Sequence, residues 1–440
     1  MVSLPYSKDK YYLGGVDWII HALNYLSQKA TGCGNLSQVI LRLSFPLDEN
    51  TLKNKLASFM RIFPCTQGRV SRDYNLAPYW KYPNELKTVI DLRCKRCKDR
   101  EEAFVFFFEA VNLPFKVKRV YVRFYWVTTP QESYFSMVFD HRLFDARGAE
   151  DFLFLFNEFF CGRFAVKETV RPVQEAGLSR WKEKFLAGKR VNRQFIGFSR
   201  GISVRYLSLP DKLQGRNFQF RTRTFDKFQS QTITDYAYNT AGYLMLAPYL
   251  LSASLLSVRE CFKDCLQNGS DFLVPVNADI RKRHSGLKQL FFNHVSFLFL
   301  RIKDEDISPN KEFISEVARK IYNEMSGGFA KDLEQASLLL RIVPLPVLKG
   351  AMRFFMRKQT VSFAFSYVVN SSGIRDFCGS TLEEIIHTPR LALESGIGVF
   401  FTQFAGNISV TFSFLRGLIS EIDADRFMML LEERLLTEYK

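Results

Sequence analysis

Histidine is scarce in this sequence, and cysteine follows no regular spacing. The 440 residues include five histidines and eight cysteines. A chain of this length does not need a disulfide framework, so we expect reduced thiols and a cytoplasmic location. Cys94 and Cys97 are separated by two residues, but a zinc site needs a second pair of ligands, and Cys261 and Cys265 have no histidine close by. We therefore predict no metal site.

Long, uninterrupted apolar runs are also missing. The first ten residues show no apolar segment after their charges, which predicts no signal peptide. Residues 241–258 are long enough to cross a membrane, but they contain a proline, three serines and two tyrosines, so a buried core helix fits better. No nucleic-acid-binding motif is present, and the basic residues are spread along the chain, so nucleic acid is not an expected partner.

The chain is instead basic and rich in phenylalanine. It has 61 Lys and Arg against 45 Asp and Glu, a net charge of +16, and 44 phenylalanines. This charge suits an acidic partner such as a coenzyme A phosphate, a carrier protein or an anionic membrane, but an ordinary solvated surface explains it equally well. The many phenylalanines suggest space for an apolar ligand, such as a lipid.

The clearest site signal is a histidine at the end of a strand pattern. Residues 134–139 (YFSMVF) are typical of a strand, and His141 follows where a turn begins. An imidazole titrates near neutral pH and suits general base catalysis. Asp145 and Gly148 come next; a carboxylate in such a turn can pair with a buried arginine and brace the loop. A histidine and an aspartate at this spacing also occur together by chance, so the context must decide.

Hydrophobic periodicity predicts a mixed α/β (α+β) chain in two parts. We expect an N-terminal half over 1–170, a crossover over 171–200 and a C-terminal half over 201–440. In the first half we predict strands at 36–45, 88–92, 117–126 and 134–139, and helices from 48–51 to Pro64, over 101–111 and over 149–160. In the second we predict strands at 202–209 and 218–225, and a helix capped by Thr234 and Asp235. The start of the 149–160 helix either offers amides to an anion or is a plain helix start.

Residues 140–148 (DHRLFDARG) resemble the HHxxxDG motif of the chloramphenicol acetyltransferase-like superfamily, which includes nonribosomal peptide condensation domains and plant BAHD acyltransferases. Later stretches are similar to the family's remaining strands and follow in the same order: 272–281, 291–301, 366–373 and 404–416. The chain departs from the pattern at Asp140, where the family has its first histidine, and at Ala146, where it has a glycine. The DFGWG motif of the BAHD branch is absent.

The resemblance implies two similar mixed-sheet halves that form a V with a tunnel between them. It further implies an acyltransferase that moves an acyl group from a coenzyme A or carrier-protein phosphopantetheine thioester to an alcohol or amine, with His141 as general base. The thioester would be a cosubstrate, and no bound cofactor is expected. Arg281 would pair with Asp145, although Arg283 is an alternative, while Gly148 would support the motif. The substrate-binding residues implied are Asn293 and Ser366.

Two other functions remain open. A non-catalytic protein on the same fold would bind a carrier protein or an acyl ligand, and the departures at Asp140 and Ala146 keep this alternative open. Residues 344–358 form a basic amphipathic segment that either rests on an anionic membrane or packs on its own domain. We expect a monomer with a small-molecule or lipidic acceptor, and an acyl or peptidyl carrier protein and peripheral membrane contact are the further partners considered.

Overall fold

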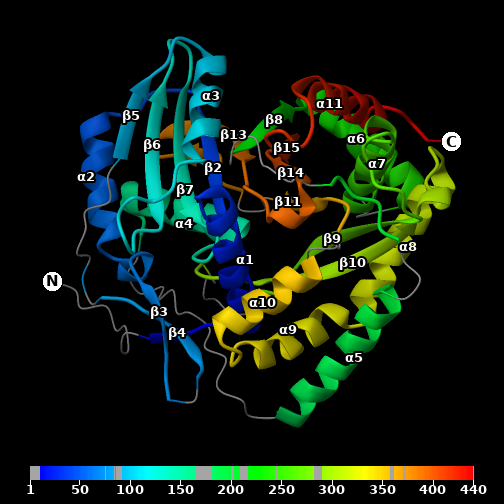
Figure 1. Cartoon of the computed structure of the whole chain (residues 1–440). Coiled ribbons are helices and arrows are strands. Elements are labelled where there is room, and N and C mark those ends of the chain that lie inside the picture. The colour runs from blue at the N-terminus through cyan, green and yellow to red at the C-terminus, as the bar shows by residue number, and fades with distance from the viewer. Residues whose placement is uncertain are drawn as a thin grey trace.

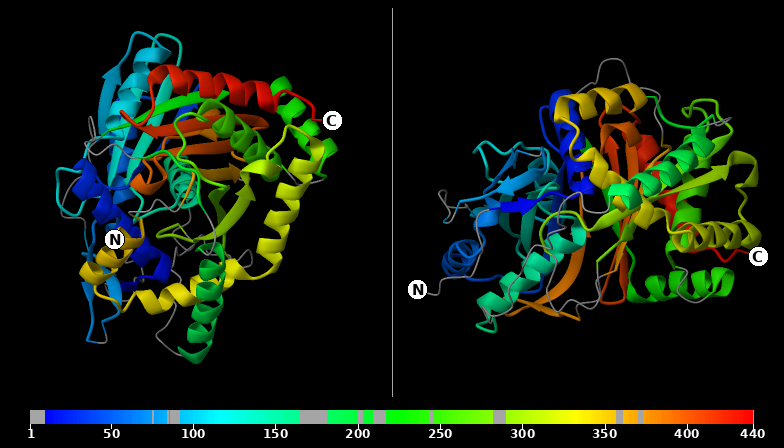
Figure 2. Two further views of the ribbon diagram at one scale, coloured as in Figure 1. Left: turned by 45° about the vertical axis from the view of Figure 1, so that its right-hand side comes forward. Right: turned by 90° about the horizontal axis from the view of Figure 1, so that it is seen from below.

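The computed structural model describes residues 10–74, 76–83, 85, 92–164, 181–199, 203–208, 217–242, 246–281, 290–356, 361–369 and 373–439. For residues 194–199, 241, 351–356 and 394 it describes the backbone alone. The chain has mixed α/β content, with two six-stranded mixed sheets lying side by side (Figure 1). Figure 2 shows the same two bodies from two further directions. The predicted fold class with two mixed-sheet halves is confirmed.

The first sheet carries the strand that ends at the motif. Its order is β12-β13-β2-β7-β6-β5, and β5 and β6 form its parallel pair. Along β7, Phe135, Met137 and Phe139 face one core cluster while Tyr134 and Val138 face another on the opposite side, as the alternation of a strand requires. The bounds are β2 (Leu36–Leu43), β5 (Leu92–Arg96), β6 (Val122–Thr128), β7 (Ser133–Asp140), β12 (Asp376–Phe377) and β13 (Ser380–His387).

Helices cover both faces of the first sheet. α2 (Glu49–Met60) and α4 (Ala146–Phe160) supply buried side chains on the Phe135 side, whereas α3 (Arg100–Ala110) packs on the Tyr134 side. α1 (Gly15–Thr31) lies between the two bodies and contacts α9 and α10 of the second half (Figure 1).

The second sheet has the order β10-β9-β11-β14-β15-β8, and β11 runs parallel to both of its neighbours. Its strands are β8 (Phe218–Thr224), β9 (Asp271–Asp279), β10 (Val295–Lys303), β11 (Ala364–Val369), β14 (Ile397–Phe404) and β15 (Asn407–Leu415). One core cluster joins this sheet to α6 (Lys227–Ala241), α7 (Leu246–Cys261), α8 (Lys311–Ser326), α9 (Phe329–Leu340) and α11 (Glu421–Leu435). A small separate sheet consists of β1 (Lys10–Tyr12), β3 (Arg69–Arg72) and β4 (Pro78–Lys81).

A strand from the second half of the sequence joins the first sheet. β13 follows β11 in sequence, yet it pairs antiparallel with β2 in the first sheet. Its Glu384 is buried, forms ion pairs with Arg42 and Arg100, and accepts a hydrogen bond from Thr224 of β8 in the second sheet. Residues 376–387 therefore belong structurally to the first sheet, although we expected the whole of 201–440 to form the C-terminal half.

Most predicted elements are present, with shifted ends. α2, α3, the β6–β7 hairpin and β8 lie where the patterns placed them. Of the buried helix predicted over 241–258, residues 246–258 belong to α7, whereas Ala241 ends α6. The predicted cap at Thr234 and Asp235 is wrong: both lie inside α6, which Asp226 caps by accepting a hydrogen bond from the Gln229 amide. Residues 88–91, 165–180 and 370–372 lie outside the described part of the chain.

Two predicted strands differ from the structure. Residues 203–208 form only isolated bridges at Val204 and Leu207, and in the 291–301 stretch the strand begins at Val295. The residues before Val295 lie against the motif loop, which we define as residues 141–145 between β7 and α4. Phe292 shows this by its bridge to Phe144. Side-chain pattern alone does not reveal that this apolar segment is used for docking onto another part of the chain.

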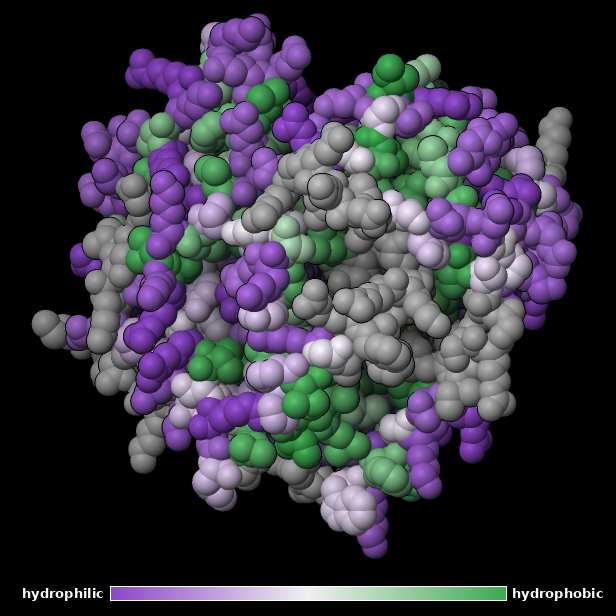
Figure 3. Space-filling model, in the orientation of Figure 1, coloured by the Kyte–Doolittle hydropathy of each residue, from purple (hydrophilic) through white to green (hydrophobic). Residues whose placement is uncertain are grey.

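The crossover contains a longer helix than the pattern indicated. α5 spans Trp181–Ser199 and packs along α9, whereas the pattern of residues 178–185 predicts only a short amphipathic segment within the crossover. The basic segment 344–358 forms α10 (Leu345–Met356), in which Leu348 is buried and Val347 is exposed. On the face of the molecule drawn in Figure 1 and Figure 3, hydrophobic residues gather in the lower part, where α9 and α10 lie. None of the described helices is long and apolar enough to span a bilayer.

Phenylalanine is used largely as core packing. The rings of Phe59, Phe63, Phe144, Phe152 and Phe291 form a continuous set of contacts with centroids 4.9–5.9 Å apart. This aromatic cluster joins α2, α4, the motif loop and the segment before β10. The cluster therefore holds the motif loop against α2 and α4. Because packing accounts for these rings, the abundance of phenylalanine does not by itself favour a lipidic ligand.

We expect Phe152→Ala to lower the free energy of unfolding by about 3–5 kcal/mol, because the ring is fully buried and its removal leaves a cavity among the other rings. Chemical denaturation monitored by circular dichroism measures this. Ile422→Ala on α11, at a side chain that is 80% exposed, is the control and should change stability by less than about 0.5 kcal/mol. Equal effects of the two substitutions would contradict the packing role of the cluster.

Candidate active site

His141 lies directly after the last residue of β7, where the chain leaves the sheet. Its backbone amide donates to the carbonyl of Asn35, just before β2, at 3.0 Å, so the turn stays attached to the neighbouring strand. The side chain is half-buried. This position, at the rim of a rigid sheet, holds the imidazole in place while leaving part of it accessible.

Asn293 determines how the imidazole is oriented. Its Nδ2 donates to the carbonyl oxygen of His141 at 3.0 Å and lies 3.4 Å from a carboxylate oxygen of Asp17. Because both of these partners are acceptors, the other amide atom, Oδ1, faces the His141 ring, 3.0 Å from Nδ1. Nδ1 must then carry the proton, and Nε2 has the free lone pair that a general base needs.

Asp17 of α1 completes this network from the other side. Its Oδ1 accepts a hydrogen bond from the backbone N–H of Asn293 at 2.9 Å, and its Oδ2 accepts one from the backbone N–H of Gly14 at 2.8 Å. The side chain is buried, and burial raises the pKa of Asp17, while the hydrogen bonds from Asn293 and Gly14 act in the opposite direction. The carboxylate lies behind Asn293, so a positive charge forming on His141 is partly balanced.

An unusual backbone conformation delivers Asn293 to the histidine. Phe292 has φ = 70°, which is rare for a bulky residue and indicates a position held by its surroundings. Its amide donates to the carbonyl of Leu143 at 2.6 Å, and its ring stacks on Tyr11 with centroids 4.0 Å apart. These contacts fasten the segment before β10 to the motif loop.

Asp145 caps α4 and fastens the same segment. Its Oδ1 accepts from the Gly148 amide at 2.8 Å and from Arg281 at 2.5 Å, while its Oδ2 accepts from the His294 amide at 2.9 Å. Burial acts to raise the pKa of Asp145, but the charge of Arg281 and the hydrogen bonds outweigh it and leave the pKa below its ordinary value. The carboxylate is therefore most stabilising above the pKa that it has in the unfolded chain, and this contribution is lost as the pH falls through the lower folded-state pKa.

Gly148 permits the close approach of α4 to the segment that carries Asn293. A Cβ atom at this position would lie 2.2 Å from the carbonyl oxygen of Leu290. The helix begins at Ala146, earlier than the predicted 149, so the glycine lies inside its first turn. The Gly148 amide is occupied by Asp145, and this amide is thus not available to an anion or an oxyanion.

Asp140, which stands where the related motif has its first histidine, forms a salt bridge. Its Oδ1 accepts from Nε of Arg142 at 2.8 Å, and its Oδ2 accepts from a terminal nitrogen of the same guanidinium at 2.6 Å. Burial acts to lower the pKa of Arg142, but the charge and the hydrogen bonds of Asp140, together with Tyr121, outweigh it and leave the pKa raised. The departure from the motif therefore replaces an imidazole by an ion pair that braces the turn on both sides of His141.

The structure thus brings together five of the seven residues singled out as the site and its alternatives. Asn293 is buried against the imidazole, where it positions His141. Ser366 lies on β11 and accepts a hydrogen bond from Asn277 at 3.3 Å, so its recorded contact is within the second sheet. Arg283 lies outside the described residues. The members of the cluster are His141, Asp145, Gly148, Arg281 and Asn293.

Sequence reasoning missed Asp17. The only available signal was an acidic residue between apolar neighbours (Val16 and Trp18), in a stretch that also starts a helix. In such a stretch an aspartate near the first turn is ordinarily a capping residue, and Asp17 does have that role through Gly14. Its second role toward Asn293 depends on a segment 276 positions away.

Solved structures similar to this chain include condensation domains and an acetyltransferase. The condensation domain of the monacolin K polyketide synthase MokA has a TM-score of 0.67 and 13% identity, covering 98% of this chain and 97% of that one. The chain has the condensation-domain fold. TRI3, a trichothecene 15-O-acetyltransferase from Fusarium sporotrichioides, has a TM-score of 0.71 and 12% identity, with 97% and 95% covered.

The starter condensation domain of the rhizomide synthetase RzmA has a TM-score of 0.66 and 10% identity, covering 98% of this chain and 96% of that one. No protein-family model and no curated protein sequence matches the chain. At such identities the likeness to condensation domains establishes the fold, and the reaction must be argued from the site.

We expect Gly148→Ala to lower stability by about 1–3 kcal/mol, because the added methyl group must push α4 away from the Leu290 backbone. Thermal and chemical unfolding measure the loss. Gly188→Ala, inside α5, is the control, since its nearest neighbour to an added Cβ is a side-chain atom 4.0 Å away. A Gly148→Ala protein as stable as Gly188→Ala would show that the close approach is not required.

Asn293→Ala should reduce kcat by on the order of 10²-fold, because the imidazole loses the acceptor that fixes its tautomer and orientation. KM should change little, since Asn293 is buried. Steady-state kinetics with any pair of substrates on which the protein shows turnover separates the two parameters. Asn54→Ala on the exposed face of α2 is the control. A rise in KM at unchanged kcat would instead make Asn293 a substrate-binding residue.

Proposed function

We propose that the protein is an acyltransferase that uses His141 as its general base. The observation that carries the proposal is the Nδ1 contact with Asn293, which leaves Nε2 of a half-buried imidazole free to accept a proton. The acyl donor in this proposal is a coenzyme A or carrier-protein phosphopantetheine thioester, which acts as cosubstrate. The acceptor is an alcohol or an amine.

The proposed reaction needs no serine or cysteine nucleophile. His141 removes a proton from the acceptor hydroxyl or amine as the oxygen or nitrogen attacks the thioester carbonyl. The tetrahedral intermediate then collapses: the carbon–sulfur bond breaks, and the imidazolium returns its proton to the leaving thiolate. Asn293 and Asp17 favour this sequence, because a carboxylate behind the amide stabilises the imidazolium that forms between the two proton transfers.

The two halves of the fold suit a two-substrate reaction. In the proposal, the donor and the acceptor enter a tunnel between the halves from opposite faces and meet at His141. Support comes from the position of the histidine at the rim of the first sheet, in contact with a segment that leads into β10 of the second. A carrier protein would then dock at one mouth of the tunnel.

A non-catalytic binding protein on the same fold is the alternative. Two features favour it: the Asp140–Arg142 ion pair in the place of the first motif histidine, and Ala146 in the place of the motif glycine. Such a protein would bind an acyl ligand or a carrier protein, and loss of the imidazole would leave that binding unchanged.

The test is acceptor-dependent release of free thiol from a panel of acyl-coenzyme A donors and acylated carrier proteins, with mixed alcohol and amine acceptors. His141→Ala should reduce the rate by about 10²-fold or more, because the base is removed and water must take the proton. His141→Gln is a size-matched second variant and should be equally impaired. Donor binding, measured by calorimetry, should persist in both variants.

Equal turnover by the wild type and both variants would remove His141 from the mechanism. Donor binding without turnover in the wild type, across the whole panel, would favour the non-catalytic alternative. The binding measurement separates these results from a variant that has simply failed to fold.

A further inference from the structure

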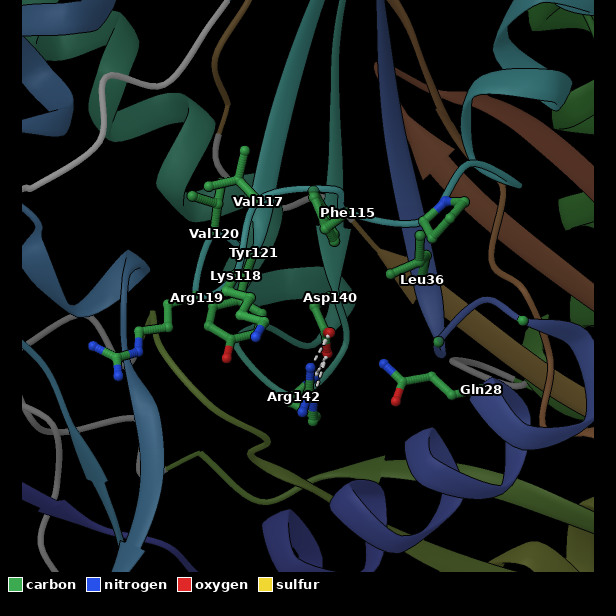
Figure 4. Close-up of a pocket in the computed structure, with 13 residues that line it drawn as sticks. Gln28, Leu36, Phe115, Val117, Lys118, Arg119, Val120, Tyr121, Asp140 and Arg142 are labelled. Atoms are coloured by element: carbon green, nitrogen blue, oxygen red, sulfur yellow. Dashed lines mark hydrogen bonds and ion pairs between the residues drawn. The ribbon is translucent and has the colours of Figure 1, made fainter.

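A pocket of about 180 Å³ opens beside the motif, on the first half of the molecule. Its walls are the C-terminal end of α1, the start of β2, the loop 114–121 and the end of β7 (Figure 4). Asp140 and Arg142 both line it, and these are the residues immediately before and after His141. A group bound in the pocket would therefore contact the two residues that flank, in the chain, the residue that we propose as the base.

The lining is positively charged. Lys118, Arg119 and Arg142 contribute three cations, and Asp140 is the one acidic side chain among the described residues that line the pocket. Both carboxylate oxygens of Asp140 already accept from Arg142, as the dashed lines in Figure 4 mark. Asp140 and Arg142 thus balance each other, and Lys118 and Arg119, which are exposed, leave an excess of two positive charges.

A buried guanidinium adds to this charge from behind the wall. Arg123 is only 8% exposed; it donates to the carbonyl of Leu113 at 2.6 Å and lies over the ring of the pocket residue Phe115, 5.0 Å from its centroid. Its Nε has no hydrogen-bond partner among the described residues. Burial lowers the pKa of Arg123, which shows that its charged form is poorly solvated there.

Burying a cation that rests on a carbonyl and aromatic rings is costly unless a negative charge lies nearby. Arg123 lies directly behind the pocket wall, since its guanidinium packs over the ring of the lining residue Phe115.

Resting on the proposed acyltransferase function, we propose that this pocket binds a negatively charged group, a carboxylate or a phosphate, of one of the substrates. The volume suits a single small group and not a long acyl chain. The charge can come from either substrate: the acceptor molecule carries it as a carboxylate, or the thioester donor carries it as a phosphate. Either way, the pocket holds that substrate by its charged group, against the turn that carries His141.

The experiment is isothermal titration calorimetry on the full chain with four probes: inorganic phosphate, succinate, coenzyme A and pantetheine. The test variant is Lys118→Gln/Arg119→Gln, whose side chains are exposed, so the fold should tolerate the change. Lys53→Gln/Lys55→Gln on the exposed face of α2 removes the same charge elsewhere and is the matched control. We expect affinity for the anionic probes to fall at least tenfold in the test variant, to stay within twofold in the control, and to weaken with added salt.

The probes distinguish the two sources of charge. Binding of phosphate and coenzyme A, with much weaker binding of pantetheine and succinate, would assign the pocket to the donor; preferential binding of succinate would assign it to a carboxylate-bearing acceptor. Binding of none of the anions at millimolar concentration, or equal affinity in the test variant and the control, would overturn the proposal.

His141→Ala keeps this inference separate from the proposed reaction. The substitution leaves the lining intact, so anion binding should be unchanged even though turnover is lost. A protein that binds the anions and shows no turnover in any form would refute the acyltransferase proposal while supporting the pocket. A protein that turns over substrates but binds no anion would do the reverse.

Discussion

The hydrogen bond between Nδ1 of His141 and Oδ1 of Asn293 is the interaction on which the geometry of the candidate site, and the chemistry proposed for it, depends. It exists only because three distant segments meet: α1 with Asp17, the end of β7 with His141, and the segment that leads into β10 with Asn293. None of these groups could act alone. A histidine without a fixed tautomer is a poor base, and an amide without a second anchor would be free to turn its nitrogen toward the ring.

The remaining contacts of the site fix these three segments relative to one another. Asp145 links Arg281, Gly148 and the His294 amide through two oxygen atoms, so one carboxylate connects α4, the end of β9 and the start of β10. Phe292 is held in a left-handed conformation between Tyr11 and the Leu143 carbonyl. The positive φ costs free energy locally, and the aromatic packing and hydrogen bonds around it offset that cost.

The sequence permits prediction of the fold class, most elements of the first half and the residue at the centre of the site. Period-two and helical patterns are local, so they identify β7 and α4 without any knowledge of the fold. The pairing of Arg281 with Asp145 and the part played by Asn293 were expected only from family resemblance, because no local pattern connects residues 136 or 152 positions apart. The resemblance gave Asn293 a place in the cleft, whereas its buried contacts with His141 and Asp17 give it a positioning role.

Long-range constraints also explain the remaining differences. Nothing in residues 291–294 indicates that they form a docking segment before β10, since apolar residues suit both a strand and a buried connection. Asp17 has the sequence signature of an ordinary helix cap, and its contact with Asn293 depends on tertiary packing. The abundance of phenylalanine reflects the packing of α2, α4 and the motif loop on one another, a demand of the core that composition alone does not distinguish from a ligand cavity.

The exchange of β13 into the first sheet also bears on how the protein folds. Arg42 and Glu384, which meet across β2 and β13, are 342 positions apart. Until β13 arrives, β2 would leave unpaired backbone groups along an apolar strand, and such an open edge invites pairing with other chains. During synthesis, therefore, the first sheet stays incomplete until β13 has been made, and pairs of such distant sequence separation form slowly. The first half is thus not a self-sufficient folding unit, and its aggregation risk is highest while the second half is still missing.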